Sequence, residues 1–297
     1  MGAALAEAGR TARDVFAEVD EALSQNLSRL MREGPDEELR LTENAQPAIM
    51  ANALAVFRAL TKDGGVDLAT AVDFVAGHSL GVYSALCAAG SFDLGTTAKL
   101  LKLRGQAMQA AVPVGVGAMA ALLGADLALA QKIADAAAEG EVCTVANDND
   151  PSQVVISGHK DAIDRAIALA KDMGAKRAIA LPVSAPFHCP LMQPAAEAMR
   201  DALSYVVLEE PVVPLYANVT AQPTSDADAI RNQLVDQVTG MVRWRESIAN
   251  LAAAGVEEFI ELGGKVLGPM VKRIAPDAKV TSVVSIDDIE ALAKEIA

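Results

Sequence analysis

The sequence of 297 residues is poor in cysteine: it has only Cys87, Cys143 and Cys189. An odd number of cysteines without close pairing argues against a disulfide framework, and none has the spacing of a zinc site. We therefore expect reduced thiols, a cytoplasmic protein and no bound metal. Cys189 adjoins His188, but adjacent side chains of an extended chain point to opposite faces, which disfavours a thiol nucleophile there.

Long apolar runs are also lacking, although apolar residues make up 52% of the chain. The most apolar stretch, residues 107–130, is interrupted by a proline and three glycines. No run approaches the roughly 18 residues that cross a bilayer, so we expect no membrane span. The first residues show no basic segment followed by an apolar one, so no secretory signal is expected either.

Basic residues are scarce relative to acidic ones: 25 Lys and Arg stand against 39 Asp and Glu, a net charge of −14. This surplus of negative charge argues against general nucleic-acid binding. It does not exclude binding to an acidic protein, because a local basic patch acts within the Debye length of about 10 Å at 0.1 M salt.

Helical and strand patterns alternate along the chain, which indicates an α/β protein. In its middle the order is strand, helix, strand, strand, helix, strand. The four strands are expected at residues 117–123, 142–146, 153–157 and 177–183. This βαββαβ order is ferredoxin-like and predicts an inserted subdomain over residues 114–183. The large domain would then comprise residues 1–113 and 184–297.

Three other segments of the large domain have clear patterns. A helix is predicted to begin around Gln46-Pro47 with Thr42 as its cap, because proline is favoured in the first helical turn. A short buried strand is predicted at residues 73–77, directly before a helix at residues 80–89. An extended segment is predicted at residues 212–219.

The run Gly77-His78-Ser79-Leu80-Gly81 lies between that strand and that helix. In this context G-x-S-x-G is typical of a sharp turn that lifts a serine above the sheet. The backbone N–H of Leu80 would donate to an oxyanion, and the helix N-terminus would favour negative charge. Ser79 is therefore the predicted nucleophile, and the alternative is a glycine-rich turn with an incidental serine.

A serine nucleophile needs a base, and the chain has three histidines. His78 directly precedes the serine and is expected to point away from it. His159 ends a predicted strand of the insertion and is expected at the surface. His188 lies between Pro186 and Pro190, which stiffen the backbone, and it follows the insertion where the chain returns to the large domain. We predict that His188 is the general base.

Seven motifs follow one another along most of the chain: GHSLG (77–81), LRGQAMQ (103–109), GAMAALLG (117–124), NDNDPSQVVISGH (147–159), VSAPFHCPLM (183–192), VRW (242–244) and LGGKVL (262–267). In this order they resemble the malonyl-CoA:acyl-carrier-protein transacylase family. The resemblance implies an α/β-hydrolase-like large domain with a ferredoxin-like insertion. It also implies transfer of malonyl groups from coenzyme A to an acyl carrier protein in fatty-acid biosynthesis, with no cofactor beyond the carrier's own phosphopantetheine.

The resemblance assigns roles by position. Ser79 would carry the malonyl group in a ping-pong reaction, with His188 as its base. Arg104 would bind the free malonyl carboxylate, since a guanidinium fork forms two parallel hydrogen bonds with a carboxylate and none with a neutral acetyl group. Gln237 would orient the histidine in place of the acid of a hydrolase triad.

Four further positions match the family near its substrate. The bulk of Phe187 would favour malonyl over methyl-branched groups. Asn147, Asn149 and Gln153 match positions near the active-site cleft. The partners implied are an acyl carrier protein and a coenzyme A thioester, and we expect a monomer. Since carrier proteins are acidic, candidate docking residues are Lys176-Arg177 and Lys265 with Lys272-Arg273.

The sequence departs from the family at its beginning. Family members begin with a short strand and a Gly-Gln-Gly-Ser-Gln-type loop, whose glutamine N–H is a second oxyanion donor, whereas this sequence begins in the first helix. Loss of one oxyanion donor costs roughly 10²–10³ in rate, so we expect a shortened, slow transferase. A version extended upstream would test this. Val82, where the family often has Glu, carries no expected catalytic consequence.

Two other functions remain open. A serine esterase or thioesterase of the α/β-hydrolase class needs an acid between serine and histidine. The candidates fall inside the predicted insertion: Asp148, Asp150, Asp161 and Asp164. That function gives Arg104 no role, and rapid hydrolysis of simple esters without malonyl transfer would favour it. The third possibility is a shortened, non-catalytic relative that binds a carrier protein, against which the intact Ser79, His188 and Arg104 argue.

Overall fold

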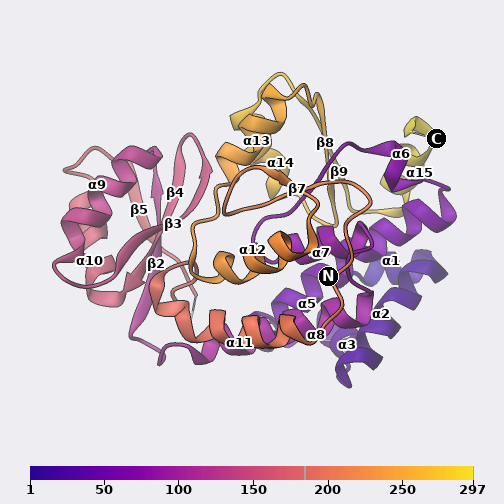
Figure 1. Ribbon diagram of the computed structural model, residues 1–297, viewed down its shortest axis with the longest axis horizontal. Helices are drawn as coiled ribbons and strands as arrows, with labels where there is room; N and C mark the ends of the chain where they lie inside the picture. Colours follow the sequence, from indigo (N-terminus) through magenta and orange to yellow (C-terminus); the bar gives the residue numbers. More distant parts are fainter. Residues whose placement is uncertain (184, 297) are drawn as a thin grey trace.

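The computed structural model describes residues 1–183 and 185–296 (Figure 1). A smaller lobe, with α9, α10 and strands β2 to β5, projects from a larger body that contains both ends of the chain. Residues 184 and 297, the predicted limits of the second part of the large domain, lie outside the described residues. Within the described part, no helix is both long and apolar enough to cross a membrane.

The larger body is mainly helical. Its helices are α1 Ala3–Ala8, α2 Arg10–Leu23, α3 Leu27–Glu33, α4 Asp36–Leu39, α5 Thr42–Arg58, the π-helical turn Ala59–Asp63, α6 Leu68–Ala71, α7 Gly81–Ala88, α8 Leu94–Ala110, the 3₁₀ turn Pro190–Met192, α11 Gln193–Ser204, α12 Ala227–Thr239, α13 Trp244–Ala253, α14 Leu267–Ile274 and α15 Ile286–Ile296. In α2 the buried residues are Ala12, Val15, Phe16 and Val19. This i, i+3, i+4, i+7 spacing forms one apolar face, which belongs to the main core that α5 and α8 share.

Helix α5 begins earlier than predicted. It starts at Thr42, with Leu41 in the capping position, and Pro47 lies inside it. The Leu41 carbonyl accepts hydrogen bonds from the N–H groups of Asn44 and Ala45. The helix tolerates the missing donor of Pro47 because Pro47 and its neighbours are buried in the main core.

Short strands, paired both in parallel and antiparallel, lie within the larger body. Strand β1 Val75–Ala76 pairs in parallel with β6 Leu215–Tyr216, and β6 pairs antiparallel with β7 Pro223–Thr224. Strand β8 Glu258–Leu262 pairs in parallel with β9 Lys279–Val283. The predicted strand at 73–77 and the extended segment at 212–219 are thus each reduced to two paired residues, although both lie where they were expected.

The smaller lobe has the predicted order of elements. It contains β2 Gly117–Leu123, α9 Leu127–Ala138, β3 Cys143–Asp150, β4 Gln153–His159, α10 Lys160–Ala170 and β5 Arg177–Ala180. The four strands form an antiparallel sheet in the order β3-β4-β2-β5. The two helices pack against the sheet through a separate core that includes Leu122, Ile133, Ile156 and Ile163. The last strand ends three residues before the predicted Val183.

Strand β3 connects the smaller lobe to the larger body through backbone hydrogen bonds and ion pairs. The Asp148 N–H donates to the Val242 carbonyl at 3.0 Å, and the Val242 N–H donates to the Ala146 carbonyl at 2.8 Å. Two buried carboxylates of the same strand form ion pairs with the body, Asp148 with Arg245 of α13 and Asp150 with Arg273 of α14, both at 2.8 Å. Strand β3 is thereby held against the larger body.

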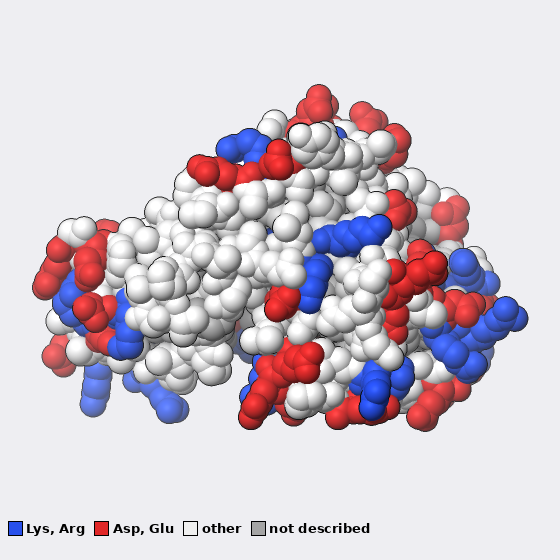
Figure 2. Space-filling model, turned by 90° about the horizontal axis from the view of Figure 1, so that it is seen from below, with Lys and Arg blue, Asp and Glu red and all other residues white. Residues whose placement is uncertain are grey.

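Figure 2 shows the side seen from below. Acidic and basic side chains lie over the end of the smaller lobe, along the upper rim and over much of the larger body, and a mostly uncharged region lies next to the smaller lobe.

Candidate active site

The turn after β1 presents Ser79 in a left-handed backbone conformation, with φ of 52°. Helix α7 begins two residues later, at Gly81. A Cβ on Gly77 would lie 2.0 Å from the Gly81 carbonyl carbon, whereas a Cβ on Gly81 would meet nothing within 4 Å. Only the first glycine of G-x-S-x-G is thus required for the close approach of strand and helix.

His188 reaches the serine from a segment far along the chain. Its Nε2 lies 2.8 Å from Ser79 Oγ, and its Nδ1 lies 2.8 Å from the Gln237 carbonyl oxygen. A carbonyl only accepts, so Nδ1 carries the proton and Nε2 is free to accept the serine hydroxyl. Burial, and then the nearby Arg104 cation, lower the pKa of His188 to about 3. The imidazole is therefore neutral near pH 7, so its unprotonated Nε2 can accept the proton of the Ser79 hydroxyl.

Arg104 lies on the buried face of α8 and is only 1% exposed. Its Nη1 donates to Gln46 Oε1 at 2.7 Å, and its Nη2 donates to Ser79 Oγ at 3.0 Å and to Gln237 Oε1 at 3.3 Å. The guanidinium also lies 5.8 Å from the Tyr83 ring centre. Burial lowers the pKa of Arg104.

All these partners of Arg104 are neutral, and its buried Nε has no hydrogen-bond acceptor among the described residues. A buried cation without a counter-ion is costly, and the cost falls when an anion binds beside it. The arrangement suits a ligand that brings a carboxylate within a few ångströms of Ser79 Oγ.

Gln237 of α12 joins the other groups, but not in the expected way. Its backbone carbonyl, rather than its side chain, orients His188. The side-chain Nε2 donates to Asn218 Oδ1 at 2.9 Å and to the Ser79 carbonyl at 3.2 Å. Its Oε1 faces Arg104, so the side chain connects the nucleophile turn with the guanidinium.

Two residues at the site were missed from the sequence, Gln46 and Asn218. Gln46 accepts from Arg104 and is 4% exposed, and a polar residue on the buried face of α5 is the signal that could have revealed it. Asn218 follows β6, the strand beside β1, and bonds to the serine turn. A polar residue just after a strand that neighbours the nucleophile strand could have indicated it.

The other predicted residues lie at different distances from this cluster. The Leu80 N–H bonds to no protein acceptor in the part of the chain described, so it is available to an oxyanion. Phe187, beside His188, is half-buried against the main core and a small cluster below β2. Asn149 Oδ1 lies 2.9 Å from His78 Nε2. Asn147 and Gln153 lie in β3 and β4, and no described hydrogen bond joins them to Ser79 or its partners.

His78, His159 and Cys189 take structural positions. His78 points to Asn149 and lies 5.7 Å from the Trp244 ring, and burial lowers its pKa. His159 Nδ1 accepts from the Val142 N–H. Cys189 is fully buried, its thiol donates to the Pro186 carbonyl, and burial raises its pKa. None of the three is placed to replace His188 or Ser79 in catalysis.

The acid of a hydrolase triad has no counterpart here. Among the described residues, no carboxylate contacts His188, whose Nδ1 faces a backbone carbonyl instead. Asp148 and Asp150, two of the candidate acids, are paired with arginines of the larger body. Asp161 and Asp164 lie in α10, on the far side of the smaller lobe. No group of three or more potential metal-ligating side chains gathers anywhere in the described chain.

A serine, a neutral histidine and a buried arginine with only neutral partners in the described chain form an arrangement suited to serine-dependent transfer of an acidic acyl group. Residues 1–266 match the family model described as the acyl transferase domain. The chain is 45% identical over 262 residues to the malonyl CoA-acyl carrier protein transacylase of Escherichia coli K12, covering 88% of this chain and 84% of that protein. The chain belongs to the malonyl CoA-acyl carrier protein transacylase family, as the motifs predicted.

Solved structures agree with this placement. The acyl-carrier-protein S-malonyltransferase of Bartonella henselae is 52% identical and superposes with a TM-score of 0.97, over 100% of this chain and 94% of that one. A malonyl-transacylase in complex with a type II polyketide acyl-carrier protein is 37% identical, with a TM-score of 0.95 over 99% of this chain and 94% of that one. The mixed α/β fold is therefore that of this family.

Proposed function

We propose that the chain transfers a malonyl group from malonyl-CoA to the phosphopantetheine thiol of an acyl carrier protein in fatty-acid synthesis. The observation that carries this proposal is the buried Arg104, which has only neutral partners and lies 3.0 Å from the nucleophile Oγ. In a malonyl-serine, a single methylene separates the acyl carbon from the free carboxylate. The carboxylate would therefore fall within reach of the guanidinium and form paired hydrogen bonds with it.

The first half-reaction follows from the geometry. Ser79 Oγ attacks the thioester carbonyl while His188 Nε2, at 2.8 Å, accepts the hydroxyl proton. The Leu80 N–H and the start of α7 stabilise the oxyanion. The carbon–sulfur bond then breaks, and the coenzyme A thiolate takes the proton from His188. The product is malonyl-Ser79 and free coenzyme A.

The second half-reaction reverses these roles. The phosphopantetheine thiol gives its proton to His188 and attacks the malonyl-serine carbonyl. When the carbon–oxygen bond breaks, Ser79 Oγ recovers the proton from His188. Gln237 keeps the imidazole in the tautomer that both steps need, through its backbone carbonyl.

The fold supports this assignment. We interpret the larger body, residues 1–113 and 184–297, as an α/β-hydrolase-like domain, because the nucleophile turn joins a parallel strand to a helix. We interpret residues 114–183 as a ferredoxin-like insertion, on account of the βαββαβ order and the antiparallel sheet. The insertion reaches the nucleophile turn through Asn149 of β3, whose Oδ1 lies 2.9 Å from His78 Nε2. Three free cysteines are in keeping with a cytoplasmic location.

The carrier protein would dock through exposed basic residues. Lys176, Arg177 and Lys265 are exposed, and so is Lys272, although it also contacts the Ala278 carbonyl. Arg273 is already paired with Asp150, so it contributes less positive field than predicted. Charge reversal at Lys176 and Lys265 should raise the KM for the carrier protein. An unchanged KM would exclude this docking surface.

Mass spectrometry of the intact protein tests the proposal. After mixing with malonyl-CoA, the protein should gain the mass of one malonyl group, and Ser79→Ala should gain none. Addition of a carrier protein bearing phosphopantetheine should remove the adduct and malonylate the carrier. Rapid hydrolysis of p-nitrophenyl esters without malonyl transfer would instead establish the esterase alternative, against which the absence of a carboxylate beside His188 in the described chain already argues.

A further inference from the structure

Asn218 is a buried residue, 2% exposed, that contacts the nucleophile turn on both sides of His78. Its Nδ2 donates to the Gly77 carbonyl at 2.8 Å. Its Oδ1 accepts from the Ser79 N–H at 2.8 Å and from Gln237 Nε2 at 2.9 Å. One side chain thus holds three groups of the site in place.

Only one orientation of the Asn218 side-chain amide satisfies its hydrogen-bond partners. A backbone N–H only donates and a carbonyl only accepts, so the oxygen must face Ser79 and the nitrogen must face Gly77. Gln237 then has to present its nitrogen to Asn218 Oδ1 and to the Ser79 carbonyl, which accepts at 3.2 Å. Consequently the Gln237 oxygen faces Arg104 Nη2, a group that only donates.

We propose that Asn218 is a positioning residue that serves both the nucleophile and the acid-selective arginine. By clamping the turn it holds Ser79 at its left-handed φ of 52°, a conformation that is strained for serine. By fixing the Gln237 amide it aligns the Arg104 guanidinium beside Oγ. The inference deepens the proposed malonyl transfer and rests on it.

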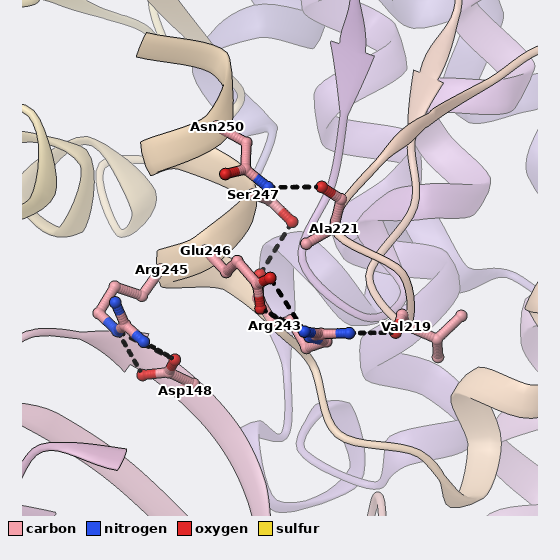
Figure 3. A network of polar contacts seen from close by, with 8 residues as sticks. All are labelled: Asp148, Val219, Ala221, Arg243, Arg245, Glu246, Ser247 and Asn250. Atoms are coloured by element: carbon pink, nitrogen blue, oxygen red, sulfur yellow. Dashed lines mark hydrogen bonds and ion pairs between the residues drawn. The ribbon is translucent and has the colours of Figure 1, made fainter. Parts of the chain in front are cut away.

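The loop that carries Asn218 is itself held from outside. Figure 3 shows the Val219 carbonyl facing the Arg243 guanidinium and the Ala221 carbonyl facing Asn250, both at α13. The Arg243 N–H also donates to the carbonyl of Asn218 at 3.0 Å. Next to these residues, Arg245 pairs with Asp148 of the smaller lobe. Several independent contacts therefore hold the loop that carries Asn218, so the loss of a single one leaves the others in place.

Two substitutions separate the two tasks of Asn218. Asn218→Ala removes all three contacts, so acylation of Ser79 should slow by roughly 100-fold, the effect of a misplaced reacting group. The preference for malonyl-CoA over acetyl-CoA should fall as well, because Gln237 is released. Asn218→Asp keeps both acceptor contacts, but it replaces the donor to Gly77 by a second carboxyl oxygen that faces the Gly77 carbonyl. It should slow acylation less and retain the malonyl preference.

Asn250→Ala is the matched control. It removes one hydrogen bond from the same loop without touching the serine turn, and both the acylation rate and the malonyl preference should stay at the wild-type values. Circular dichroism and thermal unfolding establish that each variant is folded. A folded Asn218→Ala that acylates at the wild-type rate with the wild-type preference would overturn the inference. If Asn218→Ala does not fold, Asn218→Asp is the test. A wild-type acylation rate or a lost malonyl preference in Asn218→Asp would overturn the inference.

A fluorophosphonate that labels reactive serines distinguishes this inference from the proposed function. Labelling of Ser79 reports its nucleophilicity without any acyl donor. If the wild-type protein is labelled but takes no malonyl group, the proposed function fails. The inference about the turn is then judged on labelling alone, which Asn218→Ala should slow and Asn250→Ala should leave unchanged.

Discussion

Replacement of Arg104 by methionine probes the selection of acidic acyl groups most directly. The side chain is 1% exposed, and Nη2 lies 3.0 Å from Ser79 Oγ. Methionine fills a similar volume without a charge, so the substitution removes the guanidinium and leaves His188 and the serine turn in place.

The magnitude follows from the contacts. Two hydrogen bonds from a charged group to a carboxylate contribute about 1.5–3 kcal/mol each. The malonyl carboxylate must compete with Gln46 and Gln237, which already accept from the guanidinium, so the net loss lies near the low end. A loss of about 3 kcal/mol corresponds to roughly 10²-fold in kcat/KM for malonyl-CoA. Acetyl-CoA, which has no free carboxylate, should lose little.

The assay is the rate of serine acylation with malonyl-CoA and with acetyl-CoA, measured for the wild type, Arg104→Met and Arg104→Lys. The lysine variant keeps the charge but not the fork, so its preference should lie between the other two. Thermal unfolding of Arg104→Met should not drop steeply, because an unpaired buried cation is removed. A malonyl preference that survives in Arg104→Met would refute the assigned role of Arg104.

Four further predictions concern the base, with two of them, the turn and the lobe contact. Because His188 is held neutral, the rate of Ser79 labelling should stay constant within about twofold from pH 7 to 5. A labelling rate that falls with a midpoint near the ordinary histidine pKa of about 6.5 would contradict this. The pKa of His188 is lower in the folded state than in the unfolded state, so its contribution to stability is complete above pH 6.5 and is lost as the pH falls toward 3. The loss is at most about 1.4 kcal/mol per pH unit. In urea unfolding, the free energy of unfolding of His188→Gln should therefore fall less at acid pH than that of the wild type. Gly77→Ala should abolish labelling or folding, whereas Gly81→Ala, with no atom within 4 Å of its Cβ, should keep or raise the unfolding temperature. Arg245→Ala leaves the Asp148 carboxylate buried without its partner. The substitution should lower the free energy of unfolding, measured with a chemical denaturant, by about 3 kcal/mol. An unchanged free energy of unfolding would show that water replaces the arginine.

Much of the fold was predictable because it depends on local patterns. The inserted order of strands and helices follows from hydrophobic periodicity, which short-range geometry alone sets. The boundaries were less predictable: α5 runs through Pro47, and β6 is only two residues long. In both cases tertiary packing decides how far an element extends.

The sharp turn that presents Ser79 was predictable because it is built from five consecutive residues. Arg104 was not predictable from pattern, since its place on the buried face of α8 is one where periodicity favours an apolar side chain. Its assignment before the structure depended on the resemblance to a family, and the structure adds that its described partners are all neutral.

The sequence by itself determined the sharp turn at Ser79, the order of elements in the smaller lobe and the family. Only the tertiary structure decided that His188, 109 residues from Ser79, lies 2.8 Å from it, and that a backbone carbonyl of Gln237 orients the imidazole. Gln46 and Asn218 likewise join the site from separate segments of the chain. Contacts between distant segments leave no period or motif in the sequence, because they depend on how whole elements pack and not on which residues are neighbours in the chain.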